Sequence, residues 1–188
     1  KDRERLRVWK PNAPEIKTLR SMGRRLDELQ EMKQDEENRQ KSGVSDPVVM
    51  ESLQENLKHL EDQIKALTQK IKDYVEEHPD LKEQQRLLTS IPGVGKPTAT
   101  RLIAEIGDIK EFARASQLAA YAGLAPKQFR SGSSVHKQSR ISKQGRSEFR
   151  RYLYMPAVVA SECNPIVMDL KRRMLASGHS NMEGLWQL

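Results

Sequence analysis

A seven-residue hydrophobic repeat in the first half of the chain restricts its fold more than any other feature. Apolar residues recur at alternating spacings of four and three, at Leu53, Leu57, Leu60, Ile64, Leu67, Ile71 and Tyr74. A second helical pattern begins near residue 15 and ends near residue 41, with apolar residues at Ile16, Leu19, Met22, Leu26, Leu29 and Met32. The two patterns predict an antiparallel coiled-coil hairpin, and an ordinary amphipathic helix on a bundle is the alternative.

Proline and glycine divide the chain into segments. Residues 1–14 include Trp9, Pro11 and Pro14, and we expect an extended segment there. The hairpin is predicted over 15–80, with Ser45 or Asp46 as the cap of its second helix. A small helical domain is predicted over 81–188. Its helices are expected near 81–88, 97–106, 116–123, 147–161 and 165–176, and a basic loop, with a weak hairpin signal, near 124–145. The fold class is therefore mainly all-α.

The charge of the chain is concentrated in one region. The net charge is +7, and residues 87–155 hold 12 Lys/Arg and four Asp/Glu, a surplus of eight. Such a surplus favours a polyanionic partner such as nucleic acid. Only 36% of the residues are hydrophobic, which argues against one large core. The single cysteine excludes an intrachain disulfide and a zinc finger built on thiolates.

Residues 87–106 have the pattern of a helix-hairpin-helix element. Two glycines, Gly93 and Gly95, allow a tight turn and a close approach of the backbone to a phosphate, and Lys96 adds a positive charge. The following helix would direct free amides at the anion. The alternative is a turn between two helices with glycine caps and no ligand. The spacing of a Walker phosphate loop is absent.

A second basic element follows the glycine turn. It has one acid, Glu148, and eight cationic residues: Lys127, Arg130, Lys137, Arg140, Lys143, Arg146, Arg150 and Arg151. Neutralisation of phosphates is the natural use of this density. A serine in such a loop, here Ser131, is most often a solvated turn residue. As a nucleophile it would need a base, for which His136 is a candidate, and a clamp for the charge on the phosphoryl oxygens.

Five segments in order resemble one known family: residues 90–95 (SIPGVG), 112–126 (FARASQLAAYAGLAP), 131–134 (SGSS), 139–145 (SRISKQG) and 153–157 (LYMPA). They are similar to the C-terminal transposase domain of the Piv-like insertion-sequence transposases. These proteins carry a RuvC-like DEDD domain and include the bridge-RNA-guided recombinases. The resemblance covers roughly residues 81–176, and the preceding helices resemble the coiled coil that joins the two domains of that family.

The resemblance implies a catalytic role for Ser131, the serine of the Ser-Gly motif, which would attack a DNA phosphate; Ser133 and Ser134 are lesser candidates. It also implies that a divalent metal, Mg²⁺, is held by a separate acidic domain, with no cofactor in this chain. The implied partners are DNA, a structured guide RNA in some members, and a second copy through the coiled coil. We expect no membrane association and a bacterial cytoplasmic, nucleoid-associated location.

We therefore expect the C-terminal part of a longer DNA transposase, which alone binds DNA without reacting. One alternative is a non-catalytic helix-hairpin-helix module that binds DNA or RNA. Another is a structural coiled-coil element with an incidental basic tail.

Overall fold

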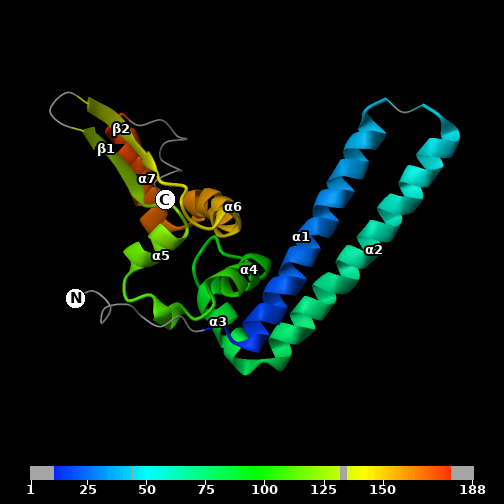
Figure 1. The fold of residues 1–188 in the computed structure, drawn as a ribbon, viewed down its shortest axis with the longest axis horizontal. Coiled ribbons are helices and arrows are strands. Elements are labelled where there is room, and N and C mark those ends of the chain that lie inside the picture. The colour runs from blue at the N-terminus through cyan, green and yellow to red at the C-terminus, as the bar shows by residue number, and fades with distance from the viewer. Residues whose placement is uncertain (1–10, 44, 132–134, 179–188) are drawn as a thin grey trace. The chain divides into compact units, whose positions relative to one another are not determined.

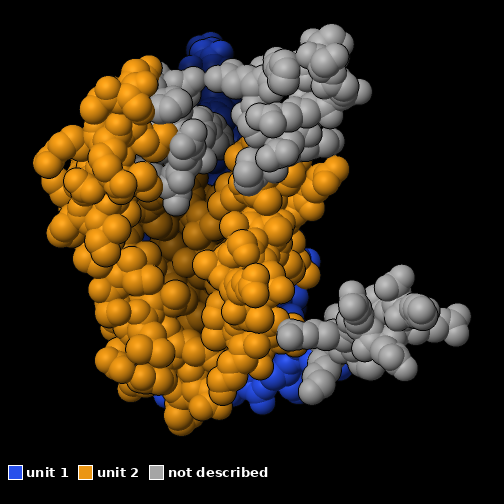
Figure 2. Space-filling view, turned by 90° about the vertical axis from the view of Figure 1, so that its left-hand side faces the viewer, with its two compact units in different colours: residues 1–78 blue, residues 79–188 orange. Residues whose placement is uncertain are grey.

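The computed structural model describes residues 11–43, 45–131 and 135–178, with residues 126–131 and 135–140 described through their backbone. The chain divides into two compact units, one up to His78 and one from Pro79 onward (Figure 2). Within the described residues there are seven α-helices and one two-stranded sheet, so the prediction of a mainly all-α fold is confirmed.

Two long helices make up the first unit (Figure 1). Helix α1 spans Pro14–Lys41 and helix α2 spans Pro47–Glu77. The side chain of Asp46 caps α2, because its Oδ1 accepts hydrogen bonds from the amides of Val48 at 2.9 Å and Val49 at 3.2 Å. The prolines at the first turn of both helices lack an amide hydrogen that would be unpaired there in any case.

The contact between α1 and α2 changes character along its length. The predicted apolar positions of α2 are all buried or half-buried, and Leu60 and Ile71 are buried. In α1, Leu19, Leu26 and Leu29 are buried. Met32, the last apolar residue of the pattern predicted in α1, is 45% exposed and is therefore not part of the buried contact.

Polar contacts join the helices beyond Met32. The Lys33 ammonium lies 2.8 Å from Glu61, and the Asn56 amide donates to the Glu36 carboxylate at 3.0 Å. The hydrogen bond from Lys33 lowers the pKa of the Glu61 carboxyl below its ordinary value. An ion pair and a hydrogen bond thus take the place of buried apolar residues of α1 beyond Met32.

The second unit is a small helical body with a β-ribbon. Its elements, in chain order, are α3 (Pro79–Thr89), α4 (Lys96–Ile106), η2 (Ile109–Glu111), α5 (Ala115–Tyr121), β1 (Pro126–Ser131), β2 (Val135–Ile141), α6 (Ser147–Cys163) and α7 (Pro165–Ala176). Buried Leu102, Ala122 and Phe149 form its core, which also receives Leu88 and Val94 from either side of the glycine turn.

The expected basic loop is largely an antiparallel ribbon of β1 and β2. The pairing of the two strands is irregular between Lys127 and Phe129, so the residues of β1 do not alternate strictly between the two faces of the ribbon. Because the strands are also rich in polar and cationic residues, their pattern differs little from that of a loop. Helix α3 begins at Pro79, two residues before the predicted start.

Candidate functional site

The turn between α3 and α4, residues 90–95, is shaped by its proline and glycines. The amide of Val94 donates to the carbonyl of Ile91 at 3.0 Å, which closes a four-residue turn with Pro92 and Gly93 at its centre. Gly93 has a φ of 104°, a conformation that residues with a side chain rarely adopt. Proline followed by a glycine of positive φ is the signature of a type II turn.

Gly93 also makes room for a neighbouring helix. A Cβ atom at this position would lie 2.8 Å from the Cβ and 2.9 Å from the Cα of Ala160 in α6. Asn164 lies at the end of the same helix, and its side-chain amide donates a hydrogen bond of 3.4 Å to the carbonyl of Pro92. The turn is therefore packed against α6, and this packing accounts for Gly93 without a ligand.

Gly95 and Lys96 are placed differently from Gly93. Both are exposed, and a Cβ atom at Gly95 would meet only the Cδ of Pro97 within 4 Å, at 3.8 Å. Gly95 is the N-cap of α4 and provides no side-chain cap. The first turn of α4 thus presents its backbone to solvent beside a lysine, which is an arrangement that accommodates an anion.

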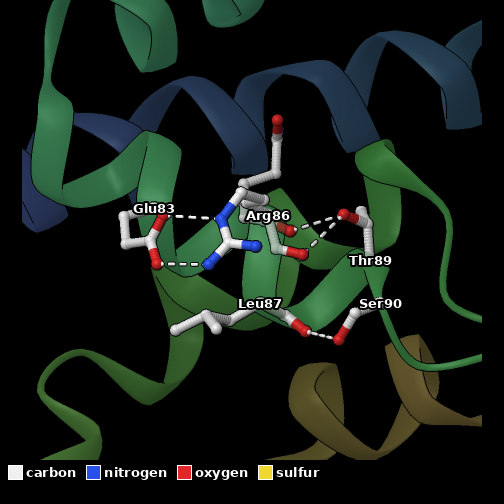
Figure 3. A network of polar contacts seen from close by, with 6 residues as sticks. Glu83, Arg86, Leu87, Thr89 and Ser90 are labelled. Carbon is white, nitrogen blue, oxygen red and sulfur yellow. Dashed lines mark hydrogen bonds and ion pairs between the residues drawn. The ribbon is translucent and has the colours of Figure 1, made fainter.

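A network of polar contacts fixes the end of α3 before the turn (Figure 3). The Arg86 guanidinium makes two hydrogen bonds of 2.7 Å to the Glu83 carboxylate. The Thr89 hydroxyl donates to the carbonyl of Gln85 at 2.8 Å, and the Ser90 hydroxyl donates to that of Leu87 at 2.7 Å (Figure 3). Both hydroxyls thus bond back to carbonyls of α3.

A hydrogen bond also joins the two helices that flank the turn. The Gln85 side-chain amide donates to the Thr100 hydroxyl at 2.7 Å, and that hydroxyl donates to the carbonyl of Lys96 at 3.0 Å. Thr100 is buried. The angle between α3 and α4 is thus fixed by a polar contact as well as by the apolar core.

The ribbon brings the candidate nucleophile close to cationic positions. Ser131 is the last residue of β1 and pairs with Val135, and the neighbouring pair is Arg130 with His136. Phe129 pairs with Lys137, and Lys127 with Arg140. Four of the predicted nucleic-acid-binding residues, Lys127, Arg130, Lys137 and Arg140, therefore lie on one short ribbon with Ser131. Ser133 and Ser134 lie outside the described residues.

The two ends of the ribbon meet at what we call the ribbon base, residues 121–125 and 142–146. The amide of Lys143 donates to the carbonyl of Gly123 at 3.0 Å, and the amide of Ser142 donates to that of Ala125 at 2.9 Å. A Cβ atom at Gly145 would collide with the amide nitrogen of Gly123, so the two backbones can touch only because residue 145 is glycine. Lys143 is exposed and has a φ of 55°.

Three predicted nucleic-acid-binding arginines make contacts within the unit. The Arg146 guanidinium lies 2.9 Å from the carboxylate of Glu105. The Arg150 guanidinium donates to the carbonyl of Ala122 at 2.9 Å, and the Arg151 guanidinium lies 5.5 Å from the centre of the Tyr152 ring. Arg146 and Arg150 thus hold the ribbon base, a role that sequence reasoning missed.

Glu105 was also missed. It is 2% exposed and lies in the run Leu102, Ile103, Ala104, Glu105, Ile106. An acid inside an apolar helical run was the available signal for a buried charge with a cationic partner.

Metal ligands and bilayer-spanning helices are both absent from the described part of the chain. That part contains no group of three or more His, Cys, Asp or Glu side chains suited to a metal ion. None of its helices combines the length and the apolar character that crossing a bilayer requires.

Comparison with known proteins places this region among transposases. The family model described as "Transposase IS116/IS110/IS902 family" matches residues 85–172, which include the glycine turn, the ribbon base and most of α7. This match agrees with the resemblance that the five sequence segments indicated.

Individual relatives agree with this family. The chain is 44% identical to the pilin gene-inverting protein of Moraxella bovis over 107 residues, which cover 57% of this chain and 33% of that protein. It is 33% identical to the insertion element IS110 uncharacterized 43.6 kDa protein of Streptomyces coelicolor over 141 residues, 75% of this chain and 34% of that protein. It is 42% identical over 71 residues to the transposase for insertion sequence element IS1111A of Coxiella burnetii, 38% of this chain and 19% of that protein. The matched regions are thus about a third or less of these relatives.

Proposed function

We propose that this chain is part of a DNA transposase or recombinase, that it binds DNA, and that Ser131 is the nucleophile of strand cleavage. The observation that carries the proposal is the position of Ser131 in the ribbon. Ser131 follows Arg130 in β1 and pairs with Val135, and Arg130 pairs with His136, in a region that matches a transposase family.

The proposed reaction is a transfer of the phosphoryl group to serine. The Oγ of Ser131 forms a bond to the phosphorus while the bond between the phosphorus and one deoxyribose oxygen breaks. The serine proton passes to a base, and the departing oxygen leaves as a hydroxyl. Because the phosphodiester energy is kept in the serine ester, a second DNA hydroxyl can reverse the step and exchange the strands.

The cationic residues of the ribbon and of the ribbon base have a distinct role in this proposal. Negative charge builds on the phosphoryl oxygens as the serine attacks, and Arg130, Lys137, Arg140 and Lys143 would stabilise it. A divalent metal, a guide RNA and pairing with a second copy through α1 and α2 remain proposals that the resemblance suggests.

The glycine turn is proposed to hold the DNA backbone as part of a helix-hairpin-helix element. Exposed Gly95 would let a phosphate approach the first turn of α4, and Lys96 would neutralise it. Gly93 contributes indirectly, because it seats the turn on α6.

Replacement of Gly95 by alanine tests the phosphate contact without disturbing the fold. A Cβ atom there would make only an ordinary van der Waals contact with the Cδ of Pro97, at 3.8 Å, so the melting temperature should stay close to that of the unsubstituted chain. If a phosphate lies against Gly95, the affinity for duplex DNA should fall several-fold. Unchanged affinity in Gly95→Ala and in Lys96→Ala would refute the contact.

Covalent trapping tests the nucleophile. A full-length protein containing this chain, incubated with its DNA substrate and any guide RNA, should form an adduct that survives denaturing electrophoresis. Ser131→Ala should abolish the adduct, while Ser133→Ala and Ser134→Ala should leave much of it. An adduct that persists in Ser131→Ala would assign the reaction to another residue.

Salt dependence tests the binding mode of the 188-residue chain. If about four to six phosphates are neutralised, the logarithm of the affinity should fall linearly with the logarithm of the salt concentration, with a slope of about −4 to −5. A flat response would argue against a phosphate-binding surface.

A further inference from the structure

We infer that Glu105 and Arg146 are positioning residues, whose ion pair fixes the ribbon base on the helical body and so holds Ser131 in one place. The consequence for strand exchange rests on the proposed function of Ser131. The pair joins α4 to the segment that leaves the ribbon, across 41 residues of sequence.

Because Glu105 is buried, its carboxylate needs a cationic partner. The Glu105 side chain is 3% exposed, that of Arg146 is 38% exposed, and their closest atoms are 2.9 Å apart. A carboxylate taken out of water requires a compensating partner, and loss of that partner is costly. Arg146 is therefore held at this point of the ribbon base by the requirement of a buried charge.

Tyr121 fixes the orientation of Arg146. The Tyr121 hydroxyl donates to the backbone carbonyl of Glu105 at 3.1 Å, and the Arg146 guanidinium lies 5.4 Å from the centre of the Tyr121 ring. The amide of Arg146 donates to the carbonyl of Tyr121 at 3.0 Å. The backbone of Arg146 is thus bonded to Tyr121, and its side chain contacts both Glu105 and Tyr121.

The constraint reaches both ends of the ribbon. Gly145, next to Arg146, lies against the backbone of Gly123 and Tyr121 so closely that no Cβ atom fits. The amide of Lys143 is bonded to Gly123, and Arg150 is bonded to the carbonyl of Ala122. The segment that precedes β1 and the segment that follows β2 are therefore fixed to one another and, through Glu105, to α4.

A rigid ribbon base matters for the proposed reaction at Ser131. Attack on a phosphate requires the reacting atoms to be aligned within about 0.5 Å, and a misplacement of about 1 Å can lower the rate roughly 100-fold. A ribbon held at a single base can move as a lever if that base loosens. Positioning by Glu105 and Arg146 should thus affect the rate of strand exchange rather than the affinity for DNA.

The variants Glu105→Gln, Arg146→Ala and Arg146→Lys test this inference in a full-length protein containing the chain. Met174→Ala is the matched control, because Met174 is buried in α7 of the same unit and is outside the ribbon base. Three quantities are measured: the rate of strand exchange at saturating DNA, the affinity for DNA as a function of salt, and hydrogen exchange at the amides of residues 142–146.

A positioning role predicts a specific pattern. Glu105→Gln and Arg146→Ala should lower the rate about 10- to 100-fold at a temperature where each variant remains folded, with affinity and salt slope nearly unchanged. The amides of residues 142–146 should exchange faster than in Met174→Ala, whose rate should remain within about threefold of the unsubstituted protein. Arg146→Lys keeps the charge and should recover part of the rate.

Two results would overturn the inference. Rates for Glu105→Gln and Arg146→Ala no lower than that of Met174→Ala would reduce the pair to a contributor to stability. A loss confined to Arg146 variants, with a salt slope smaller by about one, would make Arg146 a phosphate contact instead.

The result for Ser131→Ala separates the two proposals. If Ser131→Ala still exchanges strands, Ser131 is not the nucleophile. The comparison of Glu105→Gln and Arg146→Ala with Met174→Ala still decides the positioning role, because it measures the rate of strand exchange itself. Absence of strand exchange by the unsubstituted protein would overturn both.

Discussion

Alanine at half-buried Gly93 should destabilise the second unit more than alanine at the exposed glycines Gly95 and Gly178. Gly93 has a φ of 104°, and residues with a side chain lose about 1–2 kcal/mol in left-handed conformations. The added Cβ atom would also lie 2.8–2.9 Å from Ala160, including its backbone nitrogen and Cα. Overpacking of this kind typically costs about 1–3 kcal/mol.

The sum is about 2–5 kcal/mol of unfolding free energy. For a domain of about 100 residues, each kcal/mol corresponds to a shift of roughly 4–8 °C, so the melting temperature should fall by about 10 °C or more. Replacement of Ala160 by glycine should recover little of this loss, because the Cα and nitrogen of residue 160 remain within 2.9 Å.

Two control variants separate strain from contact. Gly178 has a φ of 88°, and a Cβ atom added there would meet nothing within 4 Å, so Gly178→Ala carries the strain alone, about 1 kcal/mol. Gly95 has a φ of −84°, and the opposing effects of chain entropy and capping should leave Gly95→Ala within about 1 kcal/mol of the unsubstituted chain.

Calorimetry of the 188-residue chain, with hydrogen exchange of the α6 amides to identify the second unit, would measure the three losses. Gly93→Asn adds a test, since asparagine tolerates left-handed φ but still carries a Cβ atom. If Gly93→Ala melts within about 2 °C of Gly178→Ala, the turn does not pack against α6 as described.

Three other perturbations have defined outcomes. Leu60 is buried and Leu67 half-buried, so Leu60→Ala should cost about 2–5 kcal/mol and Leu67→Ala less; equal and negligible changes in a thermal melt would refute the helix contact. The pKa of Glu61 is lowered by Lys33, so the pair stabilises the folded chain above the ordinary pKa of 4.5 and this stabilisation is lost as the pH falls through the lowered pKa; Glu61→Gln should flatten a pH titration of the melting temperature there. Lys143 has a φ of 55°, which asparagine also tolerates, so Lys143→Asn should keep the melting temperature and, if Lys143 contacts a phosphate, lower the salt slope of DNA binding by about one.

The helices of this chain were predictable because their signals are local. The period of four and three in α2 depends on residues within one helix, and Asp46 before Pro47 is a capping signal that neighbouring residues provide. Met32 was misassigned because its helical spacing is correct but polar pairs such as Lys33 with Glu61 replace burial beyond it. Periodicity shows which face of a helix is apolar, but it does not show where along the helix the apolar contact with the partner helix ends.

The candidate site was predictable in part for the same reason. Gly95, Lys96 and the cationic residues of the ribbon follow from motifs and charge. The ribbon base does not, because Gly145 meets Gly123 and Arg146 meets Glu105 only after the chain has folded back on itself. The contact of Gly93 with Ala160, which lies 67 residues further along the sequence, was likewise not predictable from the local motif.

The closed ribbon base makes residues 126–141 an interchangeable insert. Ser142 and Lys143 are hydrogen-bonded to Ala125 and Gly123, so the insert leaves the helical body almost where it entered it. Its length and sequence can therefore change without altering the path of the chain through α5 and α6. A shortened ribbon on this chain should leave the rest of the second unit folded. The segment that carries the proposed chemistry is thus separable from the segments that maintain the fold.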